Sequence, residues 1–208
     1  MIILNYENKH RTKIIHACVA ALKVGKVVAY PTDTSYGLGV DASNLKAIKK
    51  LYKIKGRNFN KPVHVVVPSV AYARKIVDWN ISASQLARKF WPGALTLVLG
   101  LKAKGVGYRM LSARSGFIGL RMPKNQIALD LAKYLNSPIT ATSSNVSGKP
   151  DCYSADEIIS QFQKQKFKPD IIINAGKLPE RKPSTVVKIV DGKIETLRKG
   201  PVTVKDSH

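Results

Sequence analysis

The chain has 208 residues, 44% of them hydrophobic, and its 35 Lys and Arg against 13 Asp and Glu give a formal net charge of +22 at pH 7. A chain of this size buries roughly 70% of its unfolded surface, so it needs no disulfide or metal ion to fold. No apolar run approaches the ~18 residues of a membrane helix, so we expect no transmembrane segment. The charge predicts affinity for polyanions such as RNA or nucleotides.

The cysteines point to the cellular compartment. Cys18 and Cys152 lie in no metal-binding or redox motif, and nothing resembling a cleavable signal precedes them. Thiols that are neither paired nor ligated are typical of a reducing environment. The sequence therefore predicts a cytoplasmic protein that does not associate with membranes.

Helices and strands are expected to alternate in the first half of the chain. Ile14, Ile15, Cys18 and Leu22 recur with the 3.6-residue period of a helix, which Gly25 ends. Serine is expected to cap the two helices that follow the second strand. In chain order we expect a helix over 14–22, a strand over 26–30, a loop over 32–37, a helix over 45–52 capped by Asn44, a strand over 63–67, and helices over 69–77 and 82–91.

The second half continues the alternation. The polar, glycine-rich stretch 102–115 is expected to be a loop or an irregular strand. Strands are expected over 95–99, 118–122, 139–141 and 170–174, helices over 126–135 and from Ser154, and a hairpin over 185–197 that turns at Asp191-Gly192. No repeat or linker interrupts this order. The sequence therefore predicts one α/β domain over residues 1–208, with a twisted mixed β-sheet flanked by helices.

Common cofactor signatures are missing. Ser147-Gly148-Lys149 is followed by Pro150, where a phosphate-binding P-loop needs Ser or Thr. The GxG pieces at 37–39 and 105–107 lack the third glycine of a dinucleotide site. The four histidines are scattered, without the spacing of metal ligands. We therefore expect no P-loop, no dinucleotide site and no metal ion held by the protein.

Five polar clusters lie where predicted strands or helices end, the usual ligand edge of an open α/β sheet. Lys55, Arg57 and Lys61 place three cations within seven residues, which suits a triphosphate. A helix dipole explains Lys55 but not Lys61, so we favour an anion site. Arg121 ends an apolar strand and needs an acidic partner or a carboxylate ligand. The other clusters, which are equally typical of ordinary turns, are 31–37, 140–148, and Ser184-Thr185 with Arg198.

Taken in order, these clusters resemble the YrdC family of L-threonylcarbamoyladenylate synthases. The resemblance runs from about Lys13 to Pro201. The motifs that carry it are Tyr30-Pro31-Thr32-Asp33-Thr34, the KxRxxxKP pattern of Lys55, Arg57, Lys61 and Pro62, Trp91-Pro92-Gly93, Gly119-Leu120-Arg121-Met122-Pro123, Ser143-Ser144-Asn145-Val146-Ser147-Gly148, Ser184-Thr185 and Leu197-Arg198. So many matches in the same order are typical of common ancestry.

The resemblance implies a YrdC/RibB-like fold with a central, positively charged cavity. It also implies the reaction of L-threonine, bicarbonate and ATP, with Mg²⁺ on the nucleotide, to threonylcarbamoyl-AMP and pyrophosphate. The product would pass to a threonylcarbamoyl transferase complex that makes N6-threonylcarbamoyladenosine in tRNA. The implied ATP contacts are Lys55, Arg57 and Lys61 on the phosphates, the first two as catalytic groups, Ser143 and Asn145 on nucleotide oxygens, and Arg198 closing the nucleotide site; Thr32, Arg121, Ala141 and Ser184 would bind threonine.

Two other interpretations stay open. A YciO-type paralogue of uncertain activity would share the fold, although such paralogues tend to lose the KxRxxxKP and SxNxSG motifs that are complete here. A non-catalytic RNA-binding protein would explain the net charge. Aromatic residues make up only 7% of the chain and no aromatic strand suited to base stacking is found, so binding of tRNA or double-stranded RNA would be non-specific and salt-dependent.

Overall fold

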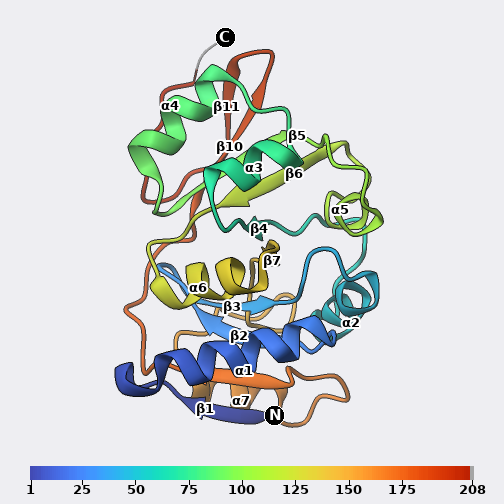
Figure 1. The fold of residues 1–208 in the computed structure, drawn as a ribbon, viewed down its shortest axis with the longest axis vertical. Helices are drawn as coiled ribbons and strands as arrows, with labels where there is room; N and C mark the ends of the chain where they lie inside the picture. The colour runs from blue at the N-terminus through green and yellow to red at the C-terminus, as the bar shows by residue number, and fades with distance from the viewer. Residues whose placement is uncertain (207–208) are drawn as a thin grey trace.

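The computed structural model describes residues 1–206, in which helices cover both faces of mixed β-sheets (Figure 1). The predicted α/β class is confirmed. The first half contains β1 (Ile2–Asn5), a 3-10 turn (Asn8–His10), α1 (Arg11–Lys23), β2 (Val28–Pro31), β3 (Tyr36–Gly39), α2 (Leu45–Lys55), β4 (Val65–Val66), α3 (Val70–Ile76), α4 (Ile81–Phe90) and β5 (Leu95–Gly100). The second half contains α5 (Val106–Leu111), β6 (Phe117–Arg121), α6 (Gln126–Leu135), β7 (Ile139–Thr140), β8 (Thr142–Ser143), α7 (Ala155–Phe162), β9 (Ile171–Asn174), β10 (Thr185–Val190) and β11 (Lys193–Arg198).

The strands form two sheets rather than the single sheet that the alternation suggested. One sheet has the order β1-β9-β2-β3-β8 and the other β11-β10-β5-β6-β4-β7. The chain passes from the second sheet to the first between β7 and β8, where only Ala141 separates Thr140 from Thr142. Because a sheet pattern repeats every two residues in either case, sequence periodicity cannot tell one twisted sheet from two.

Two hydrophobic clusters form the core. One joins α1 and α6 to one face of β2 and β9, and the other fills the opposite face of that sheet and the second sheet. In Figure 1, α1 crosses the front of the lower sheet and α7 lies behind it. Ile171 and Ile173 belong to the first cluster and Ile172 to the second, so alternate residues of β9 face opposite helices. No helix within residues 1–206 is both long and apolar enough to cross a membrane.

Several elements were not predicted, among them β1, β3 and α5. β1 pairs in parallel with β9 at the edge of its sheet, although its sequence is apolar for only a few residues. β3 occupies the end of the expected loop, because Gly39 leaves room for the Tyr30 ring: a Cβ on Gly39 would lie 2.9 Å from Tyr30 Cε1. This glycine permits close packing inside a strand. α5 lies within the expected loop 102–115 and begins at Gly105 without a side-chain cap, so it carried no start signal.

The predicted caps are largely confirmed. Asn44 accepts the Ala47 N–H at 3.0 Å and begins α2, while Ser69 and Ser154 cap α3 and α7 in the same way. The expected cap of α4 at Ser82 is wrong. Asn80 accepts the Ala83 N–H at 2.8 Å and starts the helix at Ile81, because an asparagine two residues earlier supplies an equally good acceptor.

Candidate functional site

A cavity of about 370 Å³ lies at the junction of the two sheets. Its walls come from the loop after β2, the segment between α2 and β4, the crossing from β7 to β8, the end of β6, and the two ends of the β10–β11 hairpin. The lining residues are Thr34, Ser35, Arg57, Pro62, Val63, His64, Arg121, Ala141, Thr142, Ser143, Asp151, Pro183, Ser184 and Arg198. Three arginines therefore face a single carboxylate, an arrangement that favours anionic ligands.

Arg121 is almost fully buried, at 6% exposure, and is held from one side. Its Nη2 donates to Asp33 Oδ1 in a close ion pair, and its Nη1 lies 3.4 Å from Thr34 Oγ1. The other Asp33 oxygen accepts the Lys124 N–H at 3.1 Å. Arg121 Nε has no hydrogen-bond partner within the described residues. The acidic partner expected for this arginine is thus Asp33, and a donor atom is left over for a ligand.

Arg198 is fixed through Ser184. Its Nε donates to the Ser184 carbonyl at 3.0 Å and its Nη2 to Ser184 Oγ at 3.1 Å. Ser184 Oγ also lies 2.9 Å from Thr96 Oγ1. Burial, together with the nearby Arg121, lowers the pKa of Arg198 from its usual value. The hairpin therefore brings a serine hydroxyl and a partly desolvated guanidinium to the cavity as one unit.

Lys55 supports the cavity wall from behind. Its buried ammonium donates to the Ser143 carbonyl and to Asn145 Oδ1, both at 2.6 Å. Ser143 Oγ donates to the same Asn145 oxygen at 2.7 Å, and Asn145 Nδ2 donates to the Lys149 carbonyl. Burial and the charge of Arg57 lower the pKa of Lys55 to about 8. Two hydrogen bonds thus join the KxRxxxKP motif to the Ser143–Asn145 turn, and a third stabilises the turn itself.

The remaining cations of that motif take different positions. Arg57 lines the cavity and donates from Nη2 to the Pro62 carbonyl at 2.9 Å, while its buried Nε has no partner within residues 1–206. Lys61 is exposed and is not among the lining residues, although its carbonyl accepts the Tyr52 hydroxyl at 2.9 Å. Arg57 therefore lines the cavity with one donor atom unpaired within the described residues, and Lys61 lies on the surface.

Thr32 organises the turn next to Arg121. Its hydroxyl donates to the Ser35 carbonyl at 2.7 Å and accepts the N–H groups of Thr34 and Ser35. It is buried but does not line the cavity, as is also true of Lys55 and Asn145. Of the predicted site residues, those that do line it are Arg57, Arg121, Ala141, Ser143, Ser184 and Arg198.

Two ionisable residues that line the cavity, His64 and Asp151, are not among the residues predicted from the sequence. Asp151 follows Pro150 shortly after the Ser143–Gly148 motif, which is the one signal that could have drawn attention to it. His64 stands in a β-rich run just after Pro62, where its neighbours indicate only a strand.

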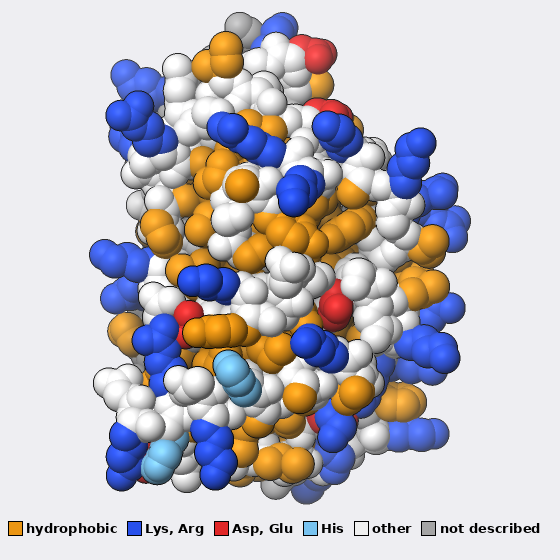
Figure 2. Space-filling view, in the orientation of Figure 1, with side chains coloured by type: hydrophobic (Ala, Val, Ile, Leu, Met, Phe, Trp, Pro, Cys, Tyr) orange, Lys and Arg blue, Asp and Glu red, His pale blue; other side chains and the backbone are white. Residues whose placement is uncertain are grey.

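Other features of the molecule are less suited to the predicted chemistry. A larger cavity, about 1010 Å³, lies between α3–α4 and the β10–β11 hairpin and contains none of the predicted site residues. Within residues 1–206, no group of three or more His, Cys, Asp or Glu side chains is placed to hold a metal ion. Lys and Arg side chains ring the face shown in Figure 2, where acidic side chains are few. We assign the site to the smaller cavity because it gathers arginines with unpaired donors.

The fold and the cavity define an α/β protein with an arginine-lined cavity between two mixed sheets. The Sua5/YciO/YrdC family model, described as "Telomere recombination", matches residues 20–200, which is most of the chain. The chain belongs to this family, as the motifs indicated.

Curated relatives extend over nearly the whole chain. A protein of Methanocaldococcus jannaschii, named provisionally as a threonylcarbamoyl-AMP synthase, is 36% identical over 203 residues, covering 98% of this chain and 93% of its own. The threonylcarbamoyl-AMP synthase of Pyrococcus abyssi is 32% identical over 209 residues, and that of Bacillus subtilis 34% over 190. These matches cover 99% and 91% of this chain but only 59% and 54% of the two relatives.

Solved structures agree with the family. Pyrococcus abyssi Sua5 complexed with L-threonine superimposes with a TM-score of 0.87 at 33% identity, covering 96% of this chain and 58% of that protein. Escherichia coli YciO superimposes with a TM-score of 0.83 at 26% identity, covering 98% of this chain and 97% of its own. The chain therefore spans little more than half of the Sua5 structure but nearly all of YciO.

Proposed function

We propose that this chain catalyses the formation of threonylcarbamoyl-AMP and pyrophosphate from L-threonine, bicarbonate and ATP. The observation that carries the proposal is the cavity in which Arg57, Arg121 and Arg198 meet, because the triphosphate of ATP and the carboxylate of threonine both need cationic partners. Relatives named threonylcarbamoyl-AMP synthase occur in archaea, bacteria and mammals. The chain is thus a nucleotidyltransferase-type enzyme acting in tRNA modification.

Each predicted residue has a place in this proposal. The free Nε of Arg57 suits a phosphate oxygen, and the free Nε of Arg121 suits the threonine carboxylate. Lys55 acts through the Ser143–Asn145 turn that it holds. The residues proposed for the ATP site are Lys55, Arg57, Lys61, Ser143, Asn145 and Arg198, and those proposed for the threonine site are Thr32, Arg121, Ala141 and Ser184. Lys55, Asn145 and Thr32 act through the turns that they stabilise.

The proposed chemistry needs no protein nucleophile. The threonine amine attacks the bicarbonate carbon, or CO₂ derived from it, and forms a carbamate. A carbamate oxygen then attacks the α-phosphorus of ATP and pyrophosphate leaves. Cationic side chains bring the two anions together and offset charge on the transferring phosphoryl group, so positioning and electrostatic stabilisation supply the rate.

Mg²⁺ and the downstream partner belong to the proposal as well. The metal ion would arrive on the triphosphate, and Asp151 is the lining carboxylate suited to reach it. The product would pass to a threonylcarbamoyl transferase complex that acts on tRNA. We also propose a cytoplasmic location and a single domain over residues 1–208.

The experiment that tests the function is pyrophosphate release from ATP, Mg²⁺ and bicarbonate, with L-threonine, serine, allothreonine or no amino acid. We expect release that depends on threonine and that falls in Lys55→Ala and Arg57→Ala. Lys49→Ala, an exposed lysine on the same helix as Lys55, is the matched control. Wild-type release in both site variants would refute the site. Release without regard to threonine, or none from protein that binds ATP, would refute the function and favour a YciO-type role.

A further inference from the structure

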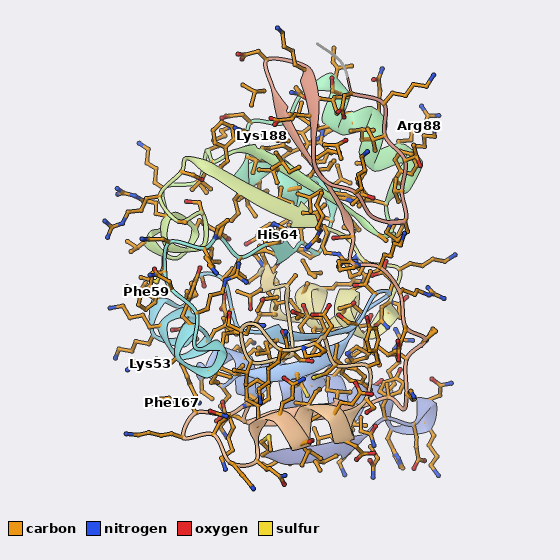
Figure 3. All side chains as sticks on the ribbon, turned by 180° about the vertical axis from the view of Figure 1, so that it is seen from behind. Lys53, Phe59, His64, Arg88, Phe167 and Lys188 are labelled. Carbon is orange, nitrogen blue, oxygen red and sulfur yellow. The ribbon has the colours of Figure 1, made fainter. Side chains whose placement is uncertain are left out.

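His64 is a cavity residue to which the proposed function assigns no task. It immediately precedes β4 and lies between the two halves of the molecule (Figure 3). Its carbonyl accepts the Ala141 N–H at 2.7 Å, which fixes the backbone. Its ring packs on Gly119 of β6, where a Cβ would lie 2.4 Å from His64 Cδ2. The glycine thus leaves the space in which the imidazole sits.

Both nitrogens of this ring are available to a ligand. Within residues 1–206 neither takes part in a hydrogen bond, although the ring lines the cavity. The side chain is partly exposed and lines the cavity, so a bound molecule can reach these nitrogens. An imidazole without a hydrogen-bond partner, beside three arginines that cannot accept a hydrogen bond, is therefore suited to receive a proton or an N–H from a bound molecule.

The proposed reaction requires such an acceptor. An amino acid in neutral water carries an ammonium group, which has no lone pair and cannot attack carbon. Forming the carbamate from this ammonium and bicarbonate releases one water and one proton. The other ionisable side chains that line the cavity are poorly suited to take this proton. Arginine stays protonated, and a carboxylate such as that of Asp151 is a weak base.

We propose that His64 accepts the proton that the threonine ammonium loses before carbamate formation. This inference rests on the proposed function and deepens it. The ammonium gives one proton to a ring nitrogen of His64, the freed lone pair forms the N–C bond to bicarbonate, and the C–O bond breaks as water leaves. The products are the carbamate anion, water and the imidazolium, so atoms and charge balance.

The surrounding charges make this role depend on bound substrate. Burial, followed by the charges of Arg198, Arg121 and Arg57, lowers the pKa of His64 to about 3 in the free protein, so the ring is neutral. Phosphates and the threonine carboxylate would pair with those arginines and remove their field, which raises the basicity of the ring. Asp151 is the one lining acid that opposes the arginines. The imidazole therefore becomes an effective base once the anions are in place.

The first test compares wild type with His64→Gln across pH. Near neutral pH we expect the threonine-dependent kcat to fall about 10²-fold, the low end for a lost general base. The deficit should shrink as pH rises, because free threonine then supplies its own neutral amine. His10→Gln, an exposed histidine outside the cavity, is the control. Unchanged ATP affinity verifies the fold. A loss that is constant with pH, or no loss, would overturn the proposal.

The second test leaves the imidazole in the chain and moves it. Gly119→Ala places a methyl group against the ring, so kcat should fall, and the double variant Gly119→Ala/His64→Gln should be no slower than His64→Gln alone. Additive losses would contradict a shared role. A readout independent of turnover is the NMR titration of the His64 ring, whose pKa should rise on adding threonine with a non-hydrolysable ATP analogue. A ring that stays neutral in that complex would also overturn the proposal. If the wild type itself releases no pyrophosphate, the result refutes the proposed function and not the role of His64 within it.

Discussion

Replacing Lys55 by methionine should change how the stability of the protein depends on pH. The ammonium of Lys55 is 3% exposed, and burial lowers its pKa from 10.5 to about 8. The unfolded chain therefore binds more protons than the folded chain between these two pH values. The free energy of unfolding thus increases as pH rises through that window, because the buried ammonium loses its charge. At roughly 1.4 kcal/mol per pKa unit, the wild type should gain about 2 to 3 kcal/mol over Lys55→Met between about pH 7 and about pH 10.

The measurement is urea unfolding of both proteins at a series of pH values. Other groups titrate in the same range, since burial also raises the pKa of Cys152 to about 11. The charges of Lys55 and Cys152 act on each other, but the folded-state pKa of Cys152 lies above the window, so its contribution to the difference between wild type and variant is small. Lys49→Met, an exposed lysine of the same helix, should follow the wild-type curve. If the difference for Lys55→Met stayed constant across the window, the buried ammonium would not have the depressed pKa on which the reasoning depends.

Three further predictions concern ligand binding, the hairpin and the core. At one ATP concentration, about 100 times the Kd of the wild type, ATP should stabilise the wild type by about 2.7 kcal/mol and Arg57→Ala by much less, measured by thermal unfolding. Equal stabilisation of the two proteins would contradict the role of Arg57 in binding phosphate. Gly200→Ala should cost about 1–3 kcal/mol and lower turnover, because its Cβ would lie 2.3 Å from the Pro183 carbonyl oxygen beside the cavity; normal turnover would show that the cavity wall tolerates the shift. Asp130→Ala should cost about 1–3 kcal/mol in urea unfolding, because the buried carboxylate accepts Arg11 Nε at 2.8 Å. Its turnover per folded molecule should be normal, and a large loss of turnover would contradict a purely structural role.

Local signals in the sequence predicted most of the elements. Asn44, Ser69 and Ser154 cap helices where expected, and the α6 helix runs over 126–135 as its apolar period indicated. The Asp191-Gly192 turn has φ of 50° and 82°, as a tight hairpin requires. These features depend on neighbouring residues, and a single sequence contains that information.

Features that depend on tertiary contact were not predictable in the same way. The division into two sheets places the crossing at Ala141, and nothing in a Ser/Thr-rich stretch distinguishes such a crossing from one continuous strand. His64 lines the cavity because Gly119, which is distant in the sequence but lies on the neighbouring strand β6, leaves space for its ring. Likewise, Lys55 and Asn145 are 90 positions apart in the chain, and only the fold joins them.

The cavity contains charges that weaken the free protein and prepare it for ligand. Among the described residues, Arg57 and Arg121 each keep a buried Nε without a partner, and burial beside Arg121 lowers the pKa of Arg198. Like charges held together in a partly desolvated site oppose folding, so sequence rules for stability would disfavour this arrangement. In the proposed reaction, the phosphates of ATP and the carboxylate of threonine would supply the missing partners. The proposed substrate site thus coincides with the place where the fold departs from a stable apolar core, because the anions would provide the interactions that these arginines lack.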